Sequence, residues 1–166
     1  MKEVAVRKTE SVWDQIQKME QQIMRRAYEI FNSNGVGQDL ENWLAAEREM
    51  IWKPAIELSE KDNQFLLRIV VAGVDPKDLR VEVTADELLV RAESQTRKKE
   101  KKGEIHTSEF QSGSLFRLVR FPKKVNPDQV KAEVKNGLLE ITVPVAVEAP
   151  AAAEAQTKKK RKAAAV

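Results

Sequence analysis

Few side chains of this sequence have the types and spacing that catalysis or metal binding requires. It contains no cysteine and one histidine, His106, so it has neither a thiolate nucleophile nor a metal site built from several such ligands. The neighbouring acids Asp86 and Glu87 fall in a predicted turn, where water would solvate both carboxylates. Gly35-Val36-Gly37 lacks the Gly-Lys-Ser/Thr ending of a phosphate loop. We therefore predict that the protein is not an enzyme and binds no cofactor and no metal.

The net positive charge is concentrated at the C-terminal end. Residues 148–166 carry five basic and two acidic side chains, whereas residues 1–147 are neutral overall. Five charges without interleaved aromatic residues give nucleic acid only weak, salt-sensitive binding. We therefore expect a solubilising tail, and a weak contact of Lys158–Lys162 with nucleic acid is the alternative.

The distribution of apolar residues bears on the location of the protein. Every apolar run is far shorter than the about 20 residues that span a bilayer, and residues 1–10 lack the apolar run of a signal peptide. The absence of cysteine fits a reducing compartment. We therefore expect a cytoplasmic protein with no membrane contact.

Two short helices are expected before residue 52. Ser11 and Asp14 have the spacing of a capping box at the start of the first helix. Its apolar residues recur every three or four positions and so form one stripe: Val12, Ile16, Met19, Ile23, Ala27 and Ile30. The second helix would have Asp39 as its N-cap and present, on adjacent turns, Leu40, Trp43, Leu44 and Glu47. Two such helices are too small for a core of their own, so their apolar faces must pack elsewhere.

After residue 52 the period of the apolar residues changes from 3.6 to 2, which is typical of β-strands. The alternation predicts strands around residues 56–58, 65–71, 81–84, 88–92, 115–121, 130–134 and 139–143. The strand at 65–71 is apolar on both faces, so it should be central in a sheet. Asn136-Gly137 predicts a type I′ hairpin, because that turn needs positive φ at both positions. Residues 95–104 contain no apolar side chain and predict a solvated loop. Strands at this spacing without intervening helices predict an all-β, antiparallel β-sandwich.

Residues 52–145 resemble the α-crystallin domain of the small heat-shock proteins. The resemblance rests on Val71-Ala72-Gly73-Val74, on Arg117 between Gly113 and Phe121-Pro122, and above all on Asn136-Gly137-Leu138-Leu139 before Val143-Pro144. Residues 22–49 are similar to a short bacterial helical module without known activity. The resemblance implies an immunoglobulin-like β-sandwich at residues 52–147, preceded by a helical arm at residues 1–51 and followed by a disordered basic tail at residues 148–166.

The same resemblance implies an ATP-independent holdase. Such a chaperone is a homo-oligomer built from dimers that binds unfolding proteins and suppresses their aggregation. The N-terminal arm would drive assembly beyond the dimer and contact clients, through Val12, Ile16, Met19, Ile23 and Trp43. Packing of this stripe within the chain is the alternative.

The resemblance also implies how two subunits would pair. A strand around Ile105–Glu109 would reach the partner's sheet, with Arg117 at the dimer interface and Glu109 as its acidic partner. The alternative is that Arg117 is an ordinary surface arginine.

Small heat-shock proteins commonly end in two aliphatic residues, at positions i and i+2, that fill a groove on a neighbouring subunit. By this resemblance the groove would lie between Val81–Val83 and the strand from Val130 to Val134. Val145 and Val147 have the required spacing. They follow Pro144 directly, which leaves almost no tether between subunits, so an extension of the last strand is the alternative.

Overall fold

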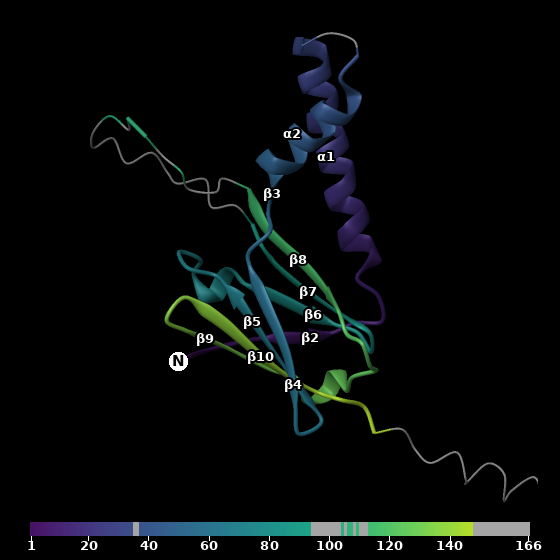
Figure 1. Cartoon of the computed structure of the whole chain (residues 1–166), viewed down its shortest axis with the longest axis vertical. Coiled ribbons are helices and arrows are strands. Elements are labelled where there is room, and N and C mark those ends of the chain that lie inside the picture. Colours follow the sequence, from purple (N-terminus) through teal and green to yellow (C-terminus); the bar gives the residue numbers. More distant parts are fainter. Residues whose placement is uncertain (35–36, 94–103, 105, 108, 110–112, 148–166) are drawn as a thin grey trace, which may run out of the picture.

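Two five-stranded sheets pack face to face, and a pair of helices projects from one end of them (Figure 1). The computed structural model describes residues 1–34, 37–93, 104, 106–107, 109 and 113–147. The strand order of the first sheet is β1 (Lys2–Val4), β9 (Lys131–Lys135), β10 (Leu138–Pro144), β5 (Gln64–Val70), β4 (Ile56–Lys61). The order of the second is β2 (Val6–Lys8), β6 (Arg80–Val83), β7 (Glu87–Ala92), β8 (Ser114–Arg120), β3 (Ile51–Trp52). The predicted β-sandwich with an N-terminal helical region is confirmed.

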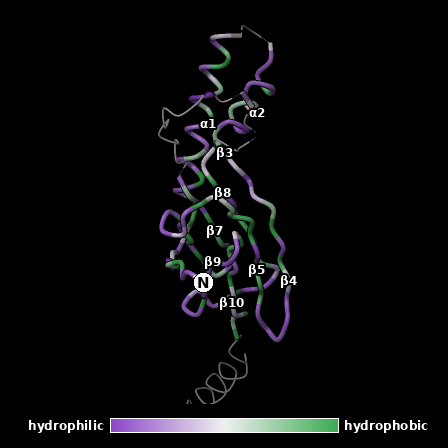
Figure 2. Tube along the Cα trace, turned by 90° about the vertical axis from the view of Figure 1, so that its left-hand side faces the viewer, coloured by the Kyte–Doolittle hydropathy of each residue, from purple (hydrophilic) through white to green (hydrophobic). Residues whose placement is uncertain are grey.

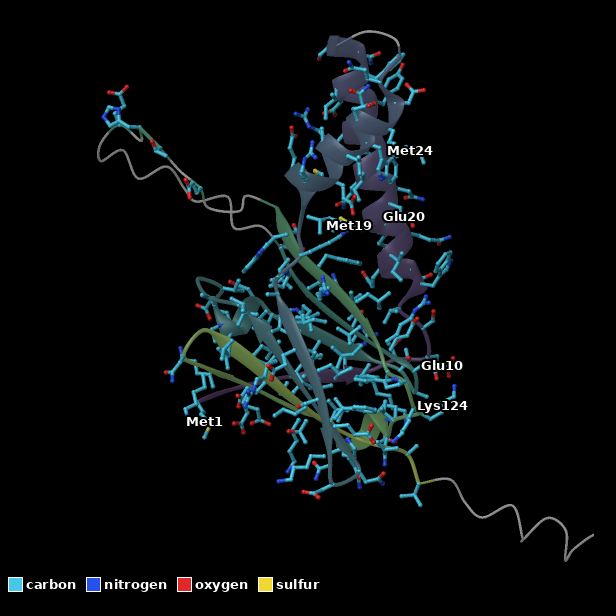
Figure 3. The ribbon with its side chains drawn as sticks, viewed as in Figure 1. Met1, Glu10, Met19, Glu20, Met24 and Lys124 are labelled. Atoms are coloured by element: carbon cyan, nitrogen blue, oxygen red, sulfur yellow. The ribbon has the colours of Figure 1, made fainter. Side chains whose placement is uncertain are left out.

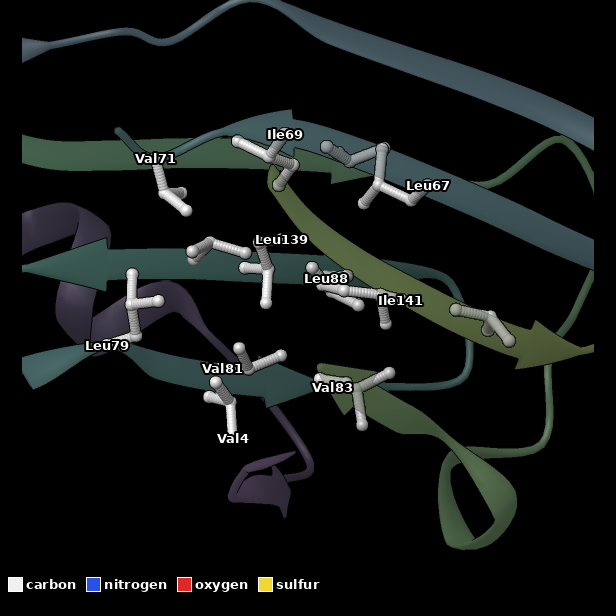
Figure 4. Close-up of a cluster of buried hydrophobic side chains, with 14 of the residues drawn as sticks. Val4, Leu67, Ile69, Val71, Leu79, Val81, Val83, Leu88, Leu139 and Ile141 are labelled. Atoms are coloured by element: carbon white, nitrogen blue, oxygen red, sulfur yellow. The ribbon is translucent and has the colours of Figure 1, made fainter. Parts of the chain in front are cut away.

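Strands β4 to β10 form where the apolar alternation predicts them. In β5, the buried residues Phe65, Leu67 and Ile69 alternate with residues that face outward. This strand lies between β10 and β4, so its central position is confirmed. The inner faces of the sheets meet in one buried cluster, which includes Val71, Val81, Val83, Leu88, Leu139 and Ile141 (Figure 4). Hydrophobic residues accordingly gather along the strands, while the turns are hydrophilic (Figure 2).

Two tight turns set the register of the first sheet. Asn136 and Gly137 have φ angles of 52° and 78°, so the type I′ turn between β9 and β10 is confirmed. Asp62 and Asn63 have φ angles of 51° and 61° and join β4 to β5 in the same way. The alternation of apolar and polar residues does not predict this second turn, because the last residues of β4 are as polar as the turn residues that follow them.

Helix α1 (Trp13–Asn34) is amphipathic, as predicted, and turns its apolar stripe toward the rest of the chain. Val12 and Ile23 are buried, and the other four stripe residues are half-buried. The Ser11 hydroxyl accepts a hydrogen bond of 3.1 Å from the backbone N–H of Trp13, which caps the first turn.

Helix α2 (Asp39–Met50) begins one residue earlier than its prediction. Asp39 is the first helical residue, and Gln38 takes the N-cap position without a hydrogen bond from its side chain. The helix packs against α1, and an ion pair of 2.7 Å between Arg26 and Glu49 joins the two helices. We call α1 and α2 together the helical hairpin.

The buried face of α2 also differs from the prediction. Leu40 and Leu44 are exposed, and the buried residues are Asn42 and Ala46, which are again four positions apart. A small residue lets two helices approach closely, whereas leucine at the contact would hold them further apart. Leucine spacing alone therefore indicated the wrong face.

Three short strands go beyond the sequence prediction. β1 and β2 fall within the predicted helical arm of residues 1–51, yet both pair with strands of the sandwich. β2 is parallel to β6 and β3 is parallel to β8, so the sandwich is antiparallel except at these two edges. Strands of two or three residues contain too few positions to show an alternation.

Two predicted segments lie wholly or largely outside the described residues: the solvated loop at residues 95–104 and the basic tail at residues 148–166. Of the pairing strand predicted at Ile105–Glu109, the described residues are His106, Thr107 and Glu109, and none of them lies in a strand within this chain.

Candidate interaction sites on the two sides of the sandwich

Residues 2–8, which we call the strap, lie across one side of the sandwich. β1 pairs antiparallel with β9, where Val4 lies opposite Ala132. β2 pairs parallel with β6, where Val6 lies opposite Val81. Without the strap, β9 and β6 would be the edge strands of their sheets. One segment therefore closes the groove between β6 and β9, the groove predicted from the sequence.

The two valines of the strap fill this groove. Val4 is only 4% exposed and belongs to the core cluster, beside Val81 (Figure 4). Val6 is half-buried and packs against the same cluster. Beneath them Val81 and Val83 are buried and Val134 is half-buried. These three residues, predicted to contact another subunit, are covered by their own chain in this structure, and their contact with a partner stays a prediction.

Two basic side chains fix the end of the strap. The Lys8 ammonium donates to both carboxylate oxygens of Asp128, at 2.8 and 2.7 Å. Arg7 lies 4.0 Å from the carboxylate of Glu82, whose side chain is only 7% exposed. Arg91 also reaches Glu82, at 3.5 Å, so the buried carboxylate has two cationic neighbours. The charges under the strap are therefore complementary to the strap.

Val145 and Val147 lie away from the groove. Val145 forms a bridge with Val125, and its backbone N–H donates to the carbonyl of Asn63 at 3.0 Å. Its side chain packs against the core, whereas Val147 is 86% exposed. Within this chain, Val145 therefore continues the path of β10. Contact of either valine with another subunit stays a prediction.

The opposite side of the sandwich, which we call the open side, ends in two strands with unpaired outer edges. β4 is the last strand of the first sheet, and β3 covers only Ser114 and Leu115 of β8. No other strand of the described part of the chain pairs with these edges. An unpaired edge presents backbone donors and acceptors on which another strand can pair.

Arg117 lies on the open side. It lies two residues from each of the core residues Leu115 and Val119, so the three share the inner face of β8. The residue is half-buried, and its Nε has no hydrogen-bond partner among the described residues although that atom is buried. Glu109 is exposed, and Ile105 is outside the described residues. A buried donor without an acceptor is costly, so a partner is expected for it.

The helical hairpin exposes a different apolar set from the one predicted. Val12 and Ile23 are buried, and Ile16, Met19 and Trp43 are half-buried, so these residues pack largely within the chain. The large exposed apolar side chains of the hairpin are Trp13, Met24, Tyr28, Leu40 and Leu44. Figure 3 shows Met19 and Met24 on different sides of α1.

The sequence contains a signal for the exposed set. Met24 follows Trp13 by eleven positions and Tyr28 follows Met24 by four. At 3.6 residues per turn, side chains with these spacings lie on the same face of a helix. A second apolar face beside the buried stripe indicates a contact outside the chain.

Other kinds of site receive less support. Among the described residues, no three histidine, aspartate or glutamate side chains gather into a group that could hold a metal ion. In the same part of the chain, neither helix combines the length and the apolarity needed to cross a membrane. A cleft of about 630 Å³ between α1 and strands β6 to β8 is lined by both signs of charge, including Lys18, Arg80 and Glu93.

Hydrogen bonds shift the pKa of Asp75 and of Arg26. Asp75, the N-cap of the 3-10 turn Pro76–Asp78, accepts a hydrogen bond from the Lys77 backbone N–H, and this lowers the pKa of its carboxyl group. Hydrogen bonds to Glu49 and Glu29 raise the pKa of Arg26.

Comparisons with known proteins agree with the motifs. The model of the Hsp20/alpha crystallin family matches residues 57–162, which take in strands from β4 to β10. The chain is 29% identical over 133 residues to spore protein SP21 of Stigmatella aurantiaca, covering 80% of this chain and 74% of that protein. It is 30% identical over 115 residues to the 17.8 kDa class I heat shock protein of Arabidopsis thaliana, covering 69% and 73%.

A solved structure shares the fold. A small heat-shock protein from Xylella fastidiosa, described as having a distinct high order structure, superposes with a TM-score of 0.52 at 28% identity. The superposition covers 60% of this chain and 92% of that chain.

Proposed function

Because this chain belongs to the Hsp20/alpha crystallin family, a family of chaperones, we propose that it is a holdase that binds unfolding proteins without ATP. The holdase keeps partly unfolded proteins from aggregating, acts as a homo-oligomer of dimers, and works in the cytoplasm. Unfolding proteins expose apolar segments and unpaired strand edges, so a holdase needs surfaces that cover both.

The observation that carries this proposal is the exposed apolar face of the helical hairpin. Trp13, Met24 and Tyr28 are each more than half exposed, and Leu40 is 67% exposed. Large apolar side chains gathered on one protruding element are typical of interaction sites. We assign them to contacts with clients and with other subunits.

The open side supports the dimer part of the proposal. A strand from a second subunit would pair with the unpaired edge of β4, and a carboxylate from that subunit would accept the hydrogen bond that the Nε of Arg117 lacks. Glu109 is exposed and is the acid that the family resemblance assigns to this contact.

Suppression of client aggregation tests the proposal. Light scattering of a heat-labile enzyme such as citrate synthase is followed at its unfolding temperature, without nucleotide, with the full chain at equal subunit concentration. We expect most of the scattering to be suppressed. Scattering equal to that with an inert protein of similar mass would contradict the holdase function.

Variants of the hairpin test its role. Replacing Trp13 and Tyr28 by serine should reduce the suppression several-fold, because it removes exposed apolar area without touching the core. The matched control replaces Gln17 and Gln21, which are exposed polar residues of the same helix, by serine. Equal loss in both variants would remove the assignment of client contacts to the apolar face.

A further inference from the structure

The cleft of about 630 Å³ lies between α1 and the second sheet, on the side of the sheet that faces away from the core. Its roof is one face of α1, because the lining residues of the helix recur at the spacing of neighbouring turns: Gln15, Lys18, Met19 and Gln22. Its floor comes from β6, β7 and β8. A concave site of this size can hold a small organic molecule.

One row of side chains crosses the floor of the cleft. Arg80 of β6 lies directly opposite Arg91 of β7, which lies directly opposite Phe116 of β8. Opposite residues of antiparallel strands point to the same face, and neighbouring strands are about 4.8 Å apart. All three residues line the cleft. Two guanidinium groups and an aromatic ring therefore share a row about 10 Å long.

The two arginines of this row carry like charges on neighbouring strands. Like charges that lie directly opposite each other destabilise a sheet. Arg80 donates from Nη1 to the backbone carbonyls of Lys77 and Leu79, at 2.7 and 3.2 Å. These neutral groups orient the guanidinium without neutralising its charge. An anion between the two arginines would offset their repulsion.

Arg91 is also short of acceptors. Its Nη2 lies 3.5 Å from the carboxylate of Glu82, at the limit of a hydrogen bond, and its buried Nε has no hydrogen-bond partner among the described residues. A buried donor without an acceptor is costly. Lys18, an exposed residue of α1, adds a third cation from the roof of the cleft. These observations favour an oxyanion as the occupant.

The acids of the cleft limit the length of that oxyanion. Asp78 lies two positions before Arg80, and Glu93 lies two positions after Arg91, so both acids line the same end of the cleft. A polyanion that continued past the arginines would meet these two carboxylates, which repel it. The cleft therefore suits a single short anionic group and excludes a strand of nucleic acid.

Apolar surface adjoins the arginines. Phe116 and Met19 are half-buried and line the cleft from the floor and from the roof. Figure 3 shows Met19 on the side of α1 toward β8. An aromatic ring offers a stacking surface to a planar group. The occupant that fits the whole row is thus an anionic group joined to a planar portion.

We propose that this cleft binds a small organic phosphate such as a nucleotide, with the phosphate against the two arginines and Lys18 and the planar portion against Phe116. Arginine suits this ligand because its planar fork matches the oxygens of a phosphate group. Binding joins α1 to the sheet, since the contacts come from both. The inference goes beyond the holdase function, does not rest on it, and requires no hydrolysis of the ligand.

Calorimetric titration of the full chain tests the proposal with three probes: AMP, inorganic phosphate and adenosine. We expect AMP to bind at least tenfold more tightly than either of its parts, because AMP alone reaches both the arginines and Phe116. Absence of AMP binding would overturn the proposal. AMP binding no tighter than that of inorganic phosphate would overturn the assignment of a planar portion to Phe116.

Two variants of the floor separate the two halves of the ligand. Arg80→Gln should weaken binding of AMP and of phosphate alike, by at least fivefold. Phe116→Leu should weaken binding of AMP and leave that of phosphate unchanged. The matched control is Arg120→Gln, because Arg120 is an exposed arginine of the same sheet that pairs with Glu87. Equal losses in Arg80→Gln and Arg120→Gln would contradict a site at the cleft.

A variant of the roof covers the case in which a sheet variant fails to fold. Lys18→Gln changes an exposed side chain of α1 and should weaken AMP binding about threefold. Thermal unfolding without ligand shows which variants are folded. AMP binding that is unchanged in every folded cleft variant would place the nucleotide elsewhere, for example on Lys158–Lys162, and would overturn the proposal.

Discussion

The two sides of the sandwich differ in whether their outer strands are paired. On the groove side, the strap pairs with both β9 and β6, and its valines complete the core. On the open side, the outer edges of β4 and of most of β8 have no strand beside them in the described part of the chain, and the buried Nε of Arg117 has no acceptor among the described residues. The chain itself closes the groove side, whereas we propose that a second subunit covers the open side.

The largest expected effect concerns Arg117. Arg117→Ala should weaken the dimer by about 2–5 kcal/mol, because it removes one partner of the charge-assisted hydrogen bond that we propose at the interface. Sedimentation of dilution series measures the dissociation constant. Arg120→Ala is the matched control, since Arg120 is exposed and pairs with Glu87 of its own chain. Identical dissociation constants for all three proteins would show that Arg117 is an ordinary surface residue.

The strap should contribute to stability within one chain. Val4→Ala removes two buried carbon atoms and should lower the free energy of unfolding by about 1.5–2 kcal/mol. Val147→Ala, at a residue 86% exposed, should change it by less than about 0.5 kcal/mol. Urea titrations compare the two variants. Equal stabilities would mean that the strap does not occupy the groove in solution.

The ionic end of the strap should matter less than its valines. Lys8→Ala removes an exposed ion pair to Asp128 and should lower the free energy of unfolding by about 0.2–1 kcal/mol in low salt. The difference from the parent should shrink at 0.5 M salt, because exposed pairs are screened. A loss as large as that of Val4→Ala, unchanged by salt, would contradict this order of contributions.

The smallest expected effect is on the second Val-Ala-Val. Because the strap fills the groove, replacing Val145 and Val147 by alanine should leave the mass of the assembly unchanged, apart from a loss of stability through half-buried Val145. Light scattering coupled to size exclusion measures that mass. Smaller assemblies would show that these valines fill a groove on a neighbouring subunit after all.

Sequence reasoning reached most of the sandwich but not the strap. β5 and β10 span seven residues each, so their alternation identifies the inward side chains. β1 and β2 span three residues each and are rich in charge, and neither produces a recognisable period. The chain contains Val-Ala-Val twice, at residues 4–6 and 145–147. A comparison of the two copies would have identified residues 4–6 as another candidate for filling the groove, followed by the basic residues Arg7 and Lys8.

The helical hairpin shows a different limit. Its buried stripe could be predicted because apolar spacing determines which residues share a face. Which face of a helix is buried depends on the element it packs against. Helix α2 packs against α1 and buries Asn42 and Ala46, whereas Leu40 and Leu44 stay exposed. For the same reason the sequence assigned client contacts to Val12 and Ile23, which the structure buries, and not to Met24 and Tyr28.

Amide hydrogen exchange of the assembled and the diluted protein tests the difference between the two sides most directly. On dissociation, peptides covering Ile56–Lys61 and Ser114–Arg120 should lose protection, because a second subunit no longer covers the open side. Peptides covering Arg80–Val83 and Lys131–Lys135 should keep theirs, because the strap belongs to the same chain. Loss of protection in β6 and β9, with none in β4 and β8, would contradict the account.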